Sequence, residues 1–441
     1  MDMVRFFSGV FALIFAQCCC AESYSLLDLY QIARQNDPQL GFSRYQVDGT
    51  KASRDIARGR MFPQVSVFGD WSENTVRYED TQLGQIPKQD YPGERYGLQL
   101  RTPIFNVKSW REYERTQALV NQSEEELGSA ESTLLAQVAT AYLQVLLADE
   151  NLTTFRAELT ALEAEFTQAE ALYERSLIPI TSVLETQTRL EVLRADTIEA
   201  KGQAAIARER LIQRAGIRDI DTMSVVSNIS LPFNIASPES AAELAIQFDT
   251  ATLARVEAVA AARKGVAREK GSWWPEVDFI YSSQYSDVGF DNLTSPPRSS
   301  ESYSLSFRYP IFEGGAGSAR LRGAWAEFYA AQQRLEEARR TADGNAREAW
   351  LNYEAMNERV VATRQALNTA EVNVSASREA VVRGVGRISD ALMALAQRTR
   401  AQTNLNQARF ERALTWLELE LAVGSDPLVL APVLSTAIHG H

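Results

Sequence analysis

Histidine and cysteine are almost absent from this sequence of 441 residues. The three cysteines occupy positions 18–20 and the only histidines are His439 and His441, so the long body between them contains neither type. This excludes Ser-His-Asp and Cys-His catalysis, thiolate chemistry and most zinc sites there. The alternative of a hydrolase that uses only carboxylates is not excluded, although no cluster of acidic residues is recognisable in the sequence. We expect no catalytic residues and no metal site.

An excess of basic residues is missing as well. The formal net charge is −12, whereas a nucleic-acid-binding protein would carry a basic footprint. We therefore expect no nucleic-acid partner, and the negative charge needs no explanation beyond solubility.

No apolar run at the N-terminus is long enough to span a bilayer as a helix. Arg5 is followed by the short apolar run 6–16, and small residues end at Ala21. This pattern predicts a signal peptide over residues 1–21, with cleavage after Ala21. Attachment of lipid to Cys18 or Cys20 is the alternative. If the peptide is removed, the mature chain has no cysteine and cannot be a disulfide scaffold.

Proline is missing from two very long stretches. Val107 to about Arg175 contains no proline and one glycine, Gly128, and Ala316 to about Arg383 also lacks proline. Each stretch predicts a helix that would run roughly 100 Å, which no compact globule needs. A break and a second long helix follow in both cases.

The two stretches belong to two similar halves related by an offset of 208 positions. The matched pairs are Ala141-Tyr142 with Ala349-Trp350, Arg175-Ser176-Leu177 with Arg383-Gly384-Val385, and Ala215-Gly216 with Val423-Gly424. A repeat this long indicates duplication of a whole structural unit. We divide the chain into the signal peptide 1–21, a first repeat 22–216, a connecting equatorial segment 217–238, a second repeat 239–424 and a C-terminal tail 425–441. Each repeat contains a helix, which in the first half is interrupted near Asp37-Pro38, then a β-hairpin and long helices.

Apolar residues in the long stretches recur at alternating steps of four and three. In the first half they are Leu134, Val138, Ala141, Val145, Ala148, Leu152, Phe155, Leu159, Leu162, Phe166, Ala169 and Tyr173. The same register moved by 208 runs from Ala342 to Val381, with ten of its twelve members apolar or aromatic. A mean period of 3.5 predicts a left-handed coiled-coil seam, which we interpret as structural.

Four short segments between the helices alternate with a period of two instead. Apolar residues share one face in each segment: Val65, Val67 and Trp71; Tyr96, Leu98 and Leu100; Val277, Phe279 and Tyr281; Tyr303, Leu305, Phe307 and Tyr309. This fits a membrane barrel with lipid on the apolar side, and also a half-buried soluble hairpin. Four strands are too few to close a barrel, so a membrane location would require several chains. We expect the links from Tyr78 to Glu94 and from Ser286 to Ser300 to be outer loops.

These features together resemble the TolC-like outer-membrane channels of type I secretion and tripartite drug efflux. The resemblance extends from about Tyr24 to Gly424, and its most specific pieces are PIFEGG at 310–315, QNDPQL at 35–40 and RGV at 383–385. It implies an α+β membrane protein in the cell outer membrane, with an antiparallel coiled-coil helical barrel in the periplasm. Four transmembrane strands per protomer would close as a twelve-stranded barrel in a homotrimer. It also implies no cofactor.

The resemblance further implies partners at the inner end of the tunnel. A periplasmic adaptor (membrane fusion) protein and an inner-membrane ABC, RND or MFS transporter would dock there. The helix-turn tips that would meet them are Arg175, Ser176, Leu177, Arg383, Gly384 and Val385. Lipid of the outer membrane would contact the Tyr303, Leu305, Phe307 and Tyr309 face.

Residues that family members have at the periplasmic aperture can be transferred to this sequence position by position. Family members often place acidic residues just after the glycine-containing break, here Gly384, and Asp390 falls at one of these positions. The next acid position of the best-known member is Met393, and its repeat counterpart is Glu185. In that member, a tyrosine and an arginine help to hold the aperture closed. The corresponding positions here are Val381 and Gly386, and Arg387 directly follows Gly386. We therefore expect Asp390, Met393, Arg387 and Glu185 at the aperture. We also expect that contacts other than those of the best-known member hold the aperture closed.

An exported trimeric coiled-coil adhesin or structural filament is the alternative function. It shares the heptads but has no need for two hairpins with an apolar face. Within the channel interpretation, export of proteins and efflux of small molecules both stay open.

Overall fold

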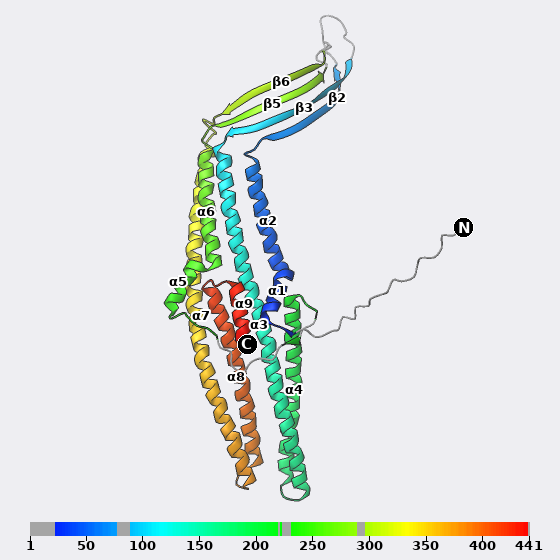
Figure 1. Cartoon of the computed structure of the whole chain (residues 1–441), viewed down its shortest axis with the longest axis vertical. Helices are drawn as coiled ribbons and strands as arrows, with labels where there is room; N and C mark the ends of the chain where they lie inside the picture. The colour runs from blue at the N-terminus through cyan, green and yellow to red at the C-terminus, as the bar shows by residue number, and fades with distance from the viewer. Residues whose placement is uncertain (1–22, 77–88, 219–220, 223–230, 289–295, 440–441) are drawn as a thin grey trace, which may run out of the picture.

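The computed structural model describes residues 23–76, 89–218, 221–222, 231–288 and 296–439. The predicted signal peptide and its cysteines lie outside the described residues, as do residues 78–88 and 289–295 of the two predicted outer loops. A curved sheet occupies one end of an elongated bundle, and two helical hairpins reach the opposite end (Figure 1).

The first helical segment is broken at Asp37-Pro38, as the sequence predicts. Helix α1 spans Leu26–Asn36 and α2 spans Pro38–Gly59. The residue before a proline avoids helical backbone angles, and Asp37 accordingly has ψ 121°. Its carboxylate accepts a hydrogen bond from the Leu40 N–H at 2.7 Å, which caps α2.

Four long helices form two antiparallel hairpins. They are α3 (Val107–Glu174), α4 (Ile180–Ala215), α7 (Ala316–Val382) and α8 (Ile388–Ala422). The predicted seam is confirmed by burial, since Val138, Leu162, Ala346 and Val360 are all buried. The last residue of the first predicted seam is an exception, because the Tyr173 side chain is exposed.

Three further helices complete the bundle: α5 (Pro238–Phe248), α6 (Thr250–Gly271) and α9 (Pro427–His439). The order of the main elements is the same in both halves, with α5 and α6 standing where α1 and α2 stand in the first. Within the segment that we describe as a C-terminal tail, α9 is helical, and its Leu430, Leu434 and Ile438 are buried in the central core. No helix among the described residues has an apolar stretch sufficient to cross a membrane.

The main sheet contains β2 (Gln64–Val76), β3 (Gln89–Phe105), β5 (Glu276–Val288) and β6 (Arg298–Arg308). The order is β2-β3-β5-β6, with antiparallel neighbours throughout. Two short strands, β1 (Ser23–Tyr24) and β4 (Asp221–Thr222), pair in parallel elsewhere. The strands run further than expected: 89–94, 286–288 and 298–300 belong to strands, so the predicted loop boundaries were wrong there. These ends are mostly polar, with Tyr91 and Val288 among the exceptions, and they show no apolar alternation.

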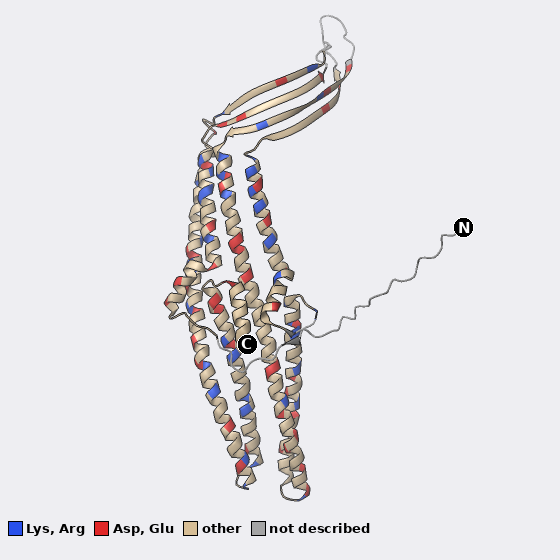
Figure 2. Ribbon diagram, in the orientation of Figure 1, with Lys and Arg blue, Asp and Glu red and all other residues tan. Residues whose placement is uncertain are grey.

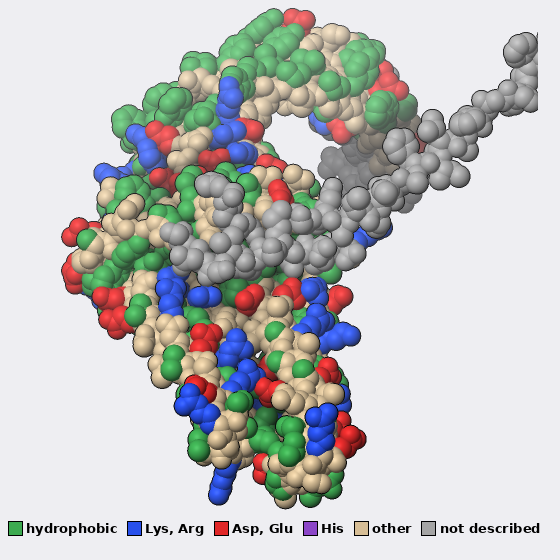
Figure 3. Space-filling model, turned by 60° about the horizontal axis from the view of Figure 1, so that its bottom comes forward, with side chains coloured by type: hydrophobic (Ala, Val, Ile, Leu, Met, Phe, Trp, Pro, Cys, Tyr) green, Lys and Arg blue, Asp and Glu red, His purple; other side chains and the backbone are tan. Residues whose placement is uncertain are grey.

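The register places the apolar residues of all four strands on one face. Val65 lies opposite Leu100, Leu100 opposite Tyr281, and Tyr281 opposite Tyr303. Because residues opposite one another in a ladder point to the same side, the apolar face is continuous across the sheet. Hydrophobic side chains gather along the outer side of this curved sheet (Figure 3).

The opposite face of the sheet is polar. Arg101 pairs with Asp278 at 2.5 Å, and Arg95 pairs with Asp70 at 2.9 Å. The edge strands β2 and β6 have no partner on their outer sides among the described residues. A sheet with one continuous apolar face and two open edges is incomplete as a single chain.

Candidate functional site

The hairpin tips, at the end opposite the sheet, contain the six predicted docking residues (Figure 1). The two turns share one backbone pattern. Ser176 N–H bonds the Tyr173 carbonyl at 2.7 Å, and Gly384 N–H bonds the Val381 carbonyl at 3.0 Å. Both turn residues have positive φ, 59° for Ser176 and 74° for Gly384. Glycine adopts this conformation freely and serine at a cost, so equivalent turns differ in strain.

Apolar side chains point into solvent at both tips. Leu177 is 66% exposed and Val385 is 82% exposed. Arg383 pairs with Glu379 on its own helix, and Arg175 forms no ion pair among the described residues. Exposed aliphatic side chains beside arginines are typical of an interaction surface.

A groove of about 590 Å³ lies between α4 and α8 just behind the tips. Glu185 and Met393 both line it, so two of the predicted aperture residues are brought together. Its other lining residues are Thr181, Leu184, Thr188, Arg189, Val192, Ser389, Leu392 and Ala396. With this end turned forward, the tips form separate lobes with hydrophobic side chains between them (Figure 3).

The other two predicted aperture residues lie nearer the tip and do not line this groove. Arg387 is the N-cap residue of α8 and makes no side-chain capping bond. Asp390 is exposed in the first turn of α8, where its negative charge interacts favourably with the helix dipole.

Sequence reasoning missed a buried polar cluster that joins three helices behind the groove. Glu158 of α3 is only 2% exposed. It accepts a hydrogen bond from Arg189 Nη2 of α4 at 2.9 Å and another from the Thr399 hydroxyl of α8. The available signal was its position: Glu158 lies one turn from Phe155 and Leu162, on the apolar face of the seam. Its partners are 31 and 241 positions away, and no local pattern identifies them.

A hydrophobic cluster surrounds this polar one. Its buried members come from α3, α4 and α8: Leu162, Leu190, Leu193, Leu392 and Leu395. The two clusters together fix α8 of the second hairpin against the first hairpin.

The predicted lipid-facing residues Tyr303, Leu305 and Phe307 lie on the apolar face of β6, and Tyr309 directly follows that strand. All four side chains are exposed. Phe307 lies opposite Val277 and Leu305 opposite Phe279, so the face continues into β5.

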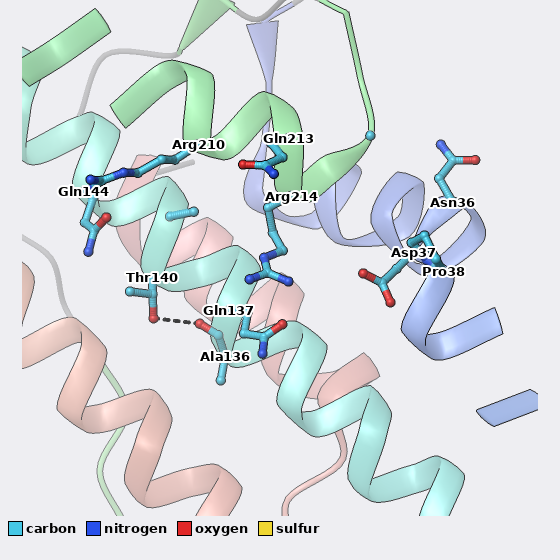
Figure 4. A pocket seen from close by; sticks show the side chains of 12 residues that line it. Asn36, Asp37, Pro38, Ala136, Gln137, Thr140, Gln144, Arg210, Gln213 and Arg214 are labelled. Atoms are coloured by element: carbon cyan, nitrogen blue, oxygen red, sulfur yellow. Dashed lines mark hydrogen bonds between the residues drawn. The ribbon is translucent and has the colours of Figure 1, made fainter. Parts of the chain in front are cut away.

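A larger groove, about 690 Å³, lies midway along the molecule beside the α1–α2 break (Figure 4). Arg210 and Arg214 of α4 and Gln137 of α3 line it, together with Asp37. The Asp37 carboxylate already caps α2, and no nucleophile or acid pair converges there. Among the described residues, no group of three or more His, Cys, Asp or Glu side chains could hold a metal ion.

Comparison with known proteins adds family information to this geometry. The family described as outer membrane efflux protein matches residues 29–216 and 246–425. The proteases secretion protein PrtF of Dickeya chrysanthemi is 23% identical over 411 residues, covering 92% of this chain and 89% of that protein. Outer membrane protein TolC of Vibrio cholerae is 24% identical over 408 residues, covering 91% of each. Among solved structures, CusC superposes with a TM-score of 0.78 at 16% identity, covering 92% of this chain and 93% of CusC.

Proposed function

The chain belongs to the outer membrane efflux protein family, and on that premise we propose that three copies assemble into one export channel. The family is one of outer-membrane transport channels for secretion or efflux, with a helical part in the periplasm. The main support for a trimer is the four-stranded sheet, which has two unpaired edges and one continuous apolar face. Three sheets of four strands would close as a twelve-stranded barrel with lipid outside and polar side chains inside.

The helices support the same assembly. Beneath the sheet the packing order is α2, α3, α6 and α7, so α2 and α7 are the free edges of one protomer. Large apolar side chains are exposed on both edges, among them Phe42 and Tyr45 on α2 and Tyr329 on α7. A neighbouring protomer would cover them, which accounts for their exposure in one chain.

At the inner end, the six tip residues would dock a periplasmic adaptor, and the adaptor would connect the channel to an inner-membrane ABC, RND or MFS transporter. The cargo is a protein or a small molecule handed over by that transporter. Copurification with an ABC transporter would indicate type I secretion, and copurification with an RND or MFS transporter would indicate efflux. The aperture residues Asp390, Met393, Arg387 and Glu185 would meet their symmetry copies around the tunnel axis.

The test of this proposal is stoichiometry combined with insertion. Light scattering of the protein in mild detergent, corrected for bound detergent, should give three copies. Leu305→Arg should impair recovery from outer membranes, because a cation on the lipid face costs about 2–4 kcal/mol near the bilayer midplane. Ser304→Arg places the same charge on the polar face and is the matched control. A stable monomer, or equal loss with both variants, would refute the proposal.

A further inference from the structure

Two pairs of helices beneath the sheet repeat each other in sequence. Helices α2 and α6 each have 22 residues, and each follows an aspartate N-cap, Asp37 or Asp249. These two helices are therefore related by an offset of 212 positions. Helices α3 and α7 are uninterrupted, so the offset of 208 found in their seams holds along their length. Each half thus contributes one unit of two helices, α2–α3 from the first half and α6–α7 from the second.

The packing inside the two units repeats as well. In the first unit, Lys51 of α2 forms an ion pair with Glu124 of α3 at 2.8 Å. In the second unit, Lys270 of α6 lies over the ring of Trp325 of α7, with Nζ 5.3 Å from its centre. Moved back by 212 and 208, the second contact stands seven positions along α2 from Lys51 and seven positions back along α3 from Glu124. Both contacts therefore belong to one antiparallel register, so the two offsets also hold in three dimensions.

Within a protomer the two units meet where α3 packs against α6. The helices approach closely at both ends of their contact, since an added Cβ at Gly271 would lie 3.2 Å from the Lys108 Cα and one at Gly128 would lie 3.4 Å from the Thr250 side chain. Charged residues of both signs occur on these helices beneath the sheet (Figure 2). Three polar contacts cross the interface: Asn121 with Glu257 at 3.3 Å, Glu114 with Lys264 at 3.3 Å, and Glu112 with Arg268 at 3.2 Å.

The outer edges of α2 and α7 have no such neighbour within one protomer. In a closed ring, each α7 edge faces the α2 edge of the next protomer, because a head-to-tail assembly repeats one interface until it closes. The two offsets relate this contact to the one between α3 and α6, since α7 repeats α3 and α2 repeats α6. Each polar contact then has a counterpart between protomers: Tyr329 with Tyr45, Arg322 with Ala52, and Arg320 with Ile56.

The exposure of these counterparts in one protomer fits that arrangement. Tyr45 is 77% exposed, Ile56 is 61% exposed and Tyr329 is 57% exposed, although the residues that they match lie at an interface. The Tyr329 ring stacks on the Trp325 ring at a centroid distance of 5.7 Å, which supports it at the edge of α7. Large apolar side chains gathered on an uncovered edge favour burial by a partner.

Two charges without ion-pair partners fit the same register. Arg322 forms no ion pair among the described residues, and neither does Asp48. Asp48 lies one helical turn from Ala52, which is the residue that the offsets place opposite Arg322. The two uncovered edges therefore carry opposite charges as well as aromatic side chains.

We propose that adjoining protomers pack through these two edges in this register, with Tyr329 against Tyr45 of the partner subunit and Arg322 beside Asp48 of the partner subunit. The occupant of each edge is a second copy of this chain. This rests on the proposed trimer and adds to it the residues that meet. Ion pairs cross the interface inside a protomer, whereas burial of aromatic and aliphatic side chains holds the protomers to one another.

The experiment uses the purified mature protein in mild detergent and a short bis-maleimide. Residues 21–441 contain no cysteine, so Tyr45→Cys with Tyr329→Cys supplies the only reactive pair. The mismatched control, Ile56→Cys with Tyr329→Cys, uses the same two edges but moves one cysteine about 16 Å along α2. The single-cysteine variants are treated alike, and denaturing gels count the joined chains.

The matched pair should give mostly three joined chains, and the mismatched pair and the single-cysteine variants should give mostly single chains. Single chains from the matched pair, or more joined chains from the mismatched pair, would overturn the proposed contact. Light scattering of the same samples separates this from failure of the assembly itself. Three copies without cross-linking of the matched pair refute only the contact, whereas a monomer refutes the trimer and the contact with it.

Discussion

The two hairpins follow the same path with different chemistry. At the left-handed turn position the first hairpin has Ser176 and the second has Gly384. Leu162 in the first seam corresponds to Ala370 in the second, and the buried pair Glu158–Arg189 corresponds to Ala366 and Gln397. A shared backbone thus carries two different packing arrangements.

Charge separates the hairpins further. Burial lowers the pKa of Arg409 in α8, and the nearby guanidinium of Arg364 in α7 lowers it again, although Glu150 acts in the opposite direction. Arg409 and Arg364 are like charges that interact across α8 and α7, although Arg359 with Glu411 and Arg398 with Glu371 pair opposite charges across the same two helices. We predict that α7–α8 rather than α3–α4 moves when the tunnel opens, which would require α8 to leave its contacts with the first hairpin at Leu392, Leu395 and Thr399.

The largest expected effect comes from separating the buried ion pair. Arg189→Met leaves the Glu158 carboxylate without its cation, which should destabilise the first hairpin by about 3 kcal/mol at neutral pH. Gln397→Met, at the corresponding position of the second hairpin, should change little. Hydrogen exchange of tip peptides in the purified protein measures both, and similar losses in the two variants would remove this distinction between the hairpins.

Leu162→Ala makes the first seam equal to the second at one position. The side chain is fully buried among leucines of α4 and α8, so we expect a loss of about 3 kcal/mol. Exchange at the first tip should then approach the rate at the second tip. Unchanged protection in α4 would mean that the leucine cluster does not hold the hairpins together.

The turn residues should give smaller effects of opposite sign. Ser176→Gly relieves a positive φ and should stabilise the first tip, while Gly384→Ser should destabilise the second, each by about 1 kcal/mol. Local exchange rates at residues 172–177 and 380–385 provide the measurement. If both substitutions shift exchange in the same direction, the turns are not equivalent.

The smallest effect concerns ion selectivity. Three copies of Asp390 would form a ring of negative charge that attracts cations, so Asp390→Asn should reduce cation preference and relieve block by divalent cations added from the periplasmic side. Reversal potentials across a salt gradient measure the change. Glu185→Gln is the comparison, because Glu185 lies in the groove and Asp390 does not. Unchanged selectivity with Asp390→Asn would leave that residue as a solvated helix residue.

The sequence predicts the long helices well because periodicity and proline are local signals. Val107–Glu174 and Ala316–Val382 begin where expected and end within one residue of expectation. Strand ends are predicted poorly, since polar ends such as Arg298–Ser300 pair through their backbone without any alternation of side chains. The apolar residues of α9 give no helical signal as strong as the long seams, and their burial depends on partners far away in the chain.

Whether the predicted aperture residues form an aperture stays a prediction, and the sequence anticipates only some of their neighbours in the structure. Glu185 and Met393 are matched by the 208-residue offset, and they line one groove. Asp390 precedes Met393 by three positions, yet it does not line that groove. The Glu158 cluster joins three helices distant in sequence, so it needs the fold to be recognised.

Planar-bilayer recording of a reversibly cross-linked channel tests most directly whether α7–α8 moves against a fixed α3–α4. Residues 21–441 contain no cysteine, so Glu185→Cys with Met393→Cys allows a cleavable bis-maleimide to join α4 to α8 across their groove. We predict that the wild type conducts with transitions to larger conductance, that cross-linking abolishes these transitions, and that cleavage of the linker restores them. The single-cysteine variants treated alike are the controls. Absence of current from purified trimers, or unchanged transitions after complete cross-linking, would contradict the account.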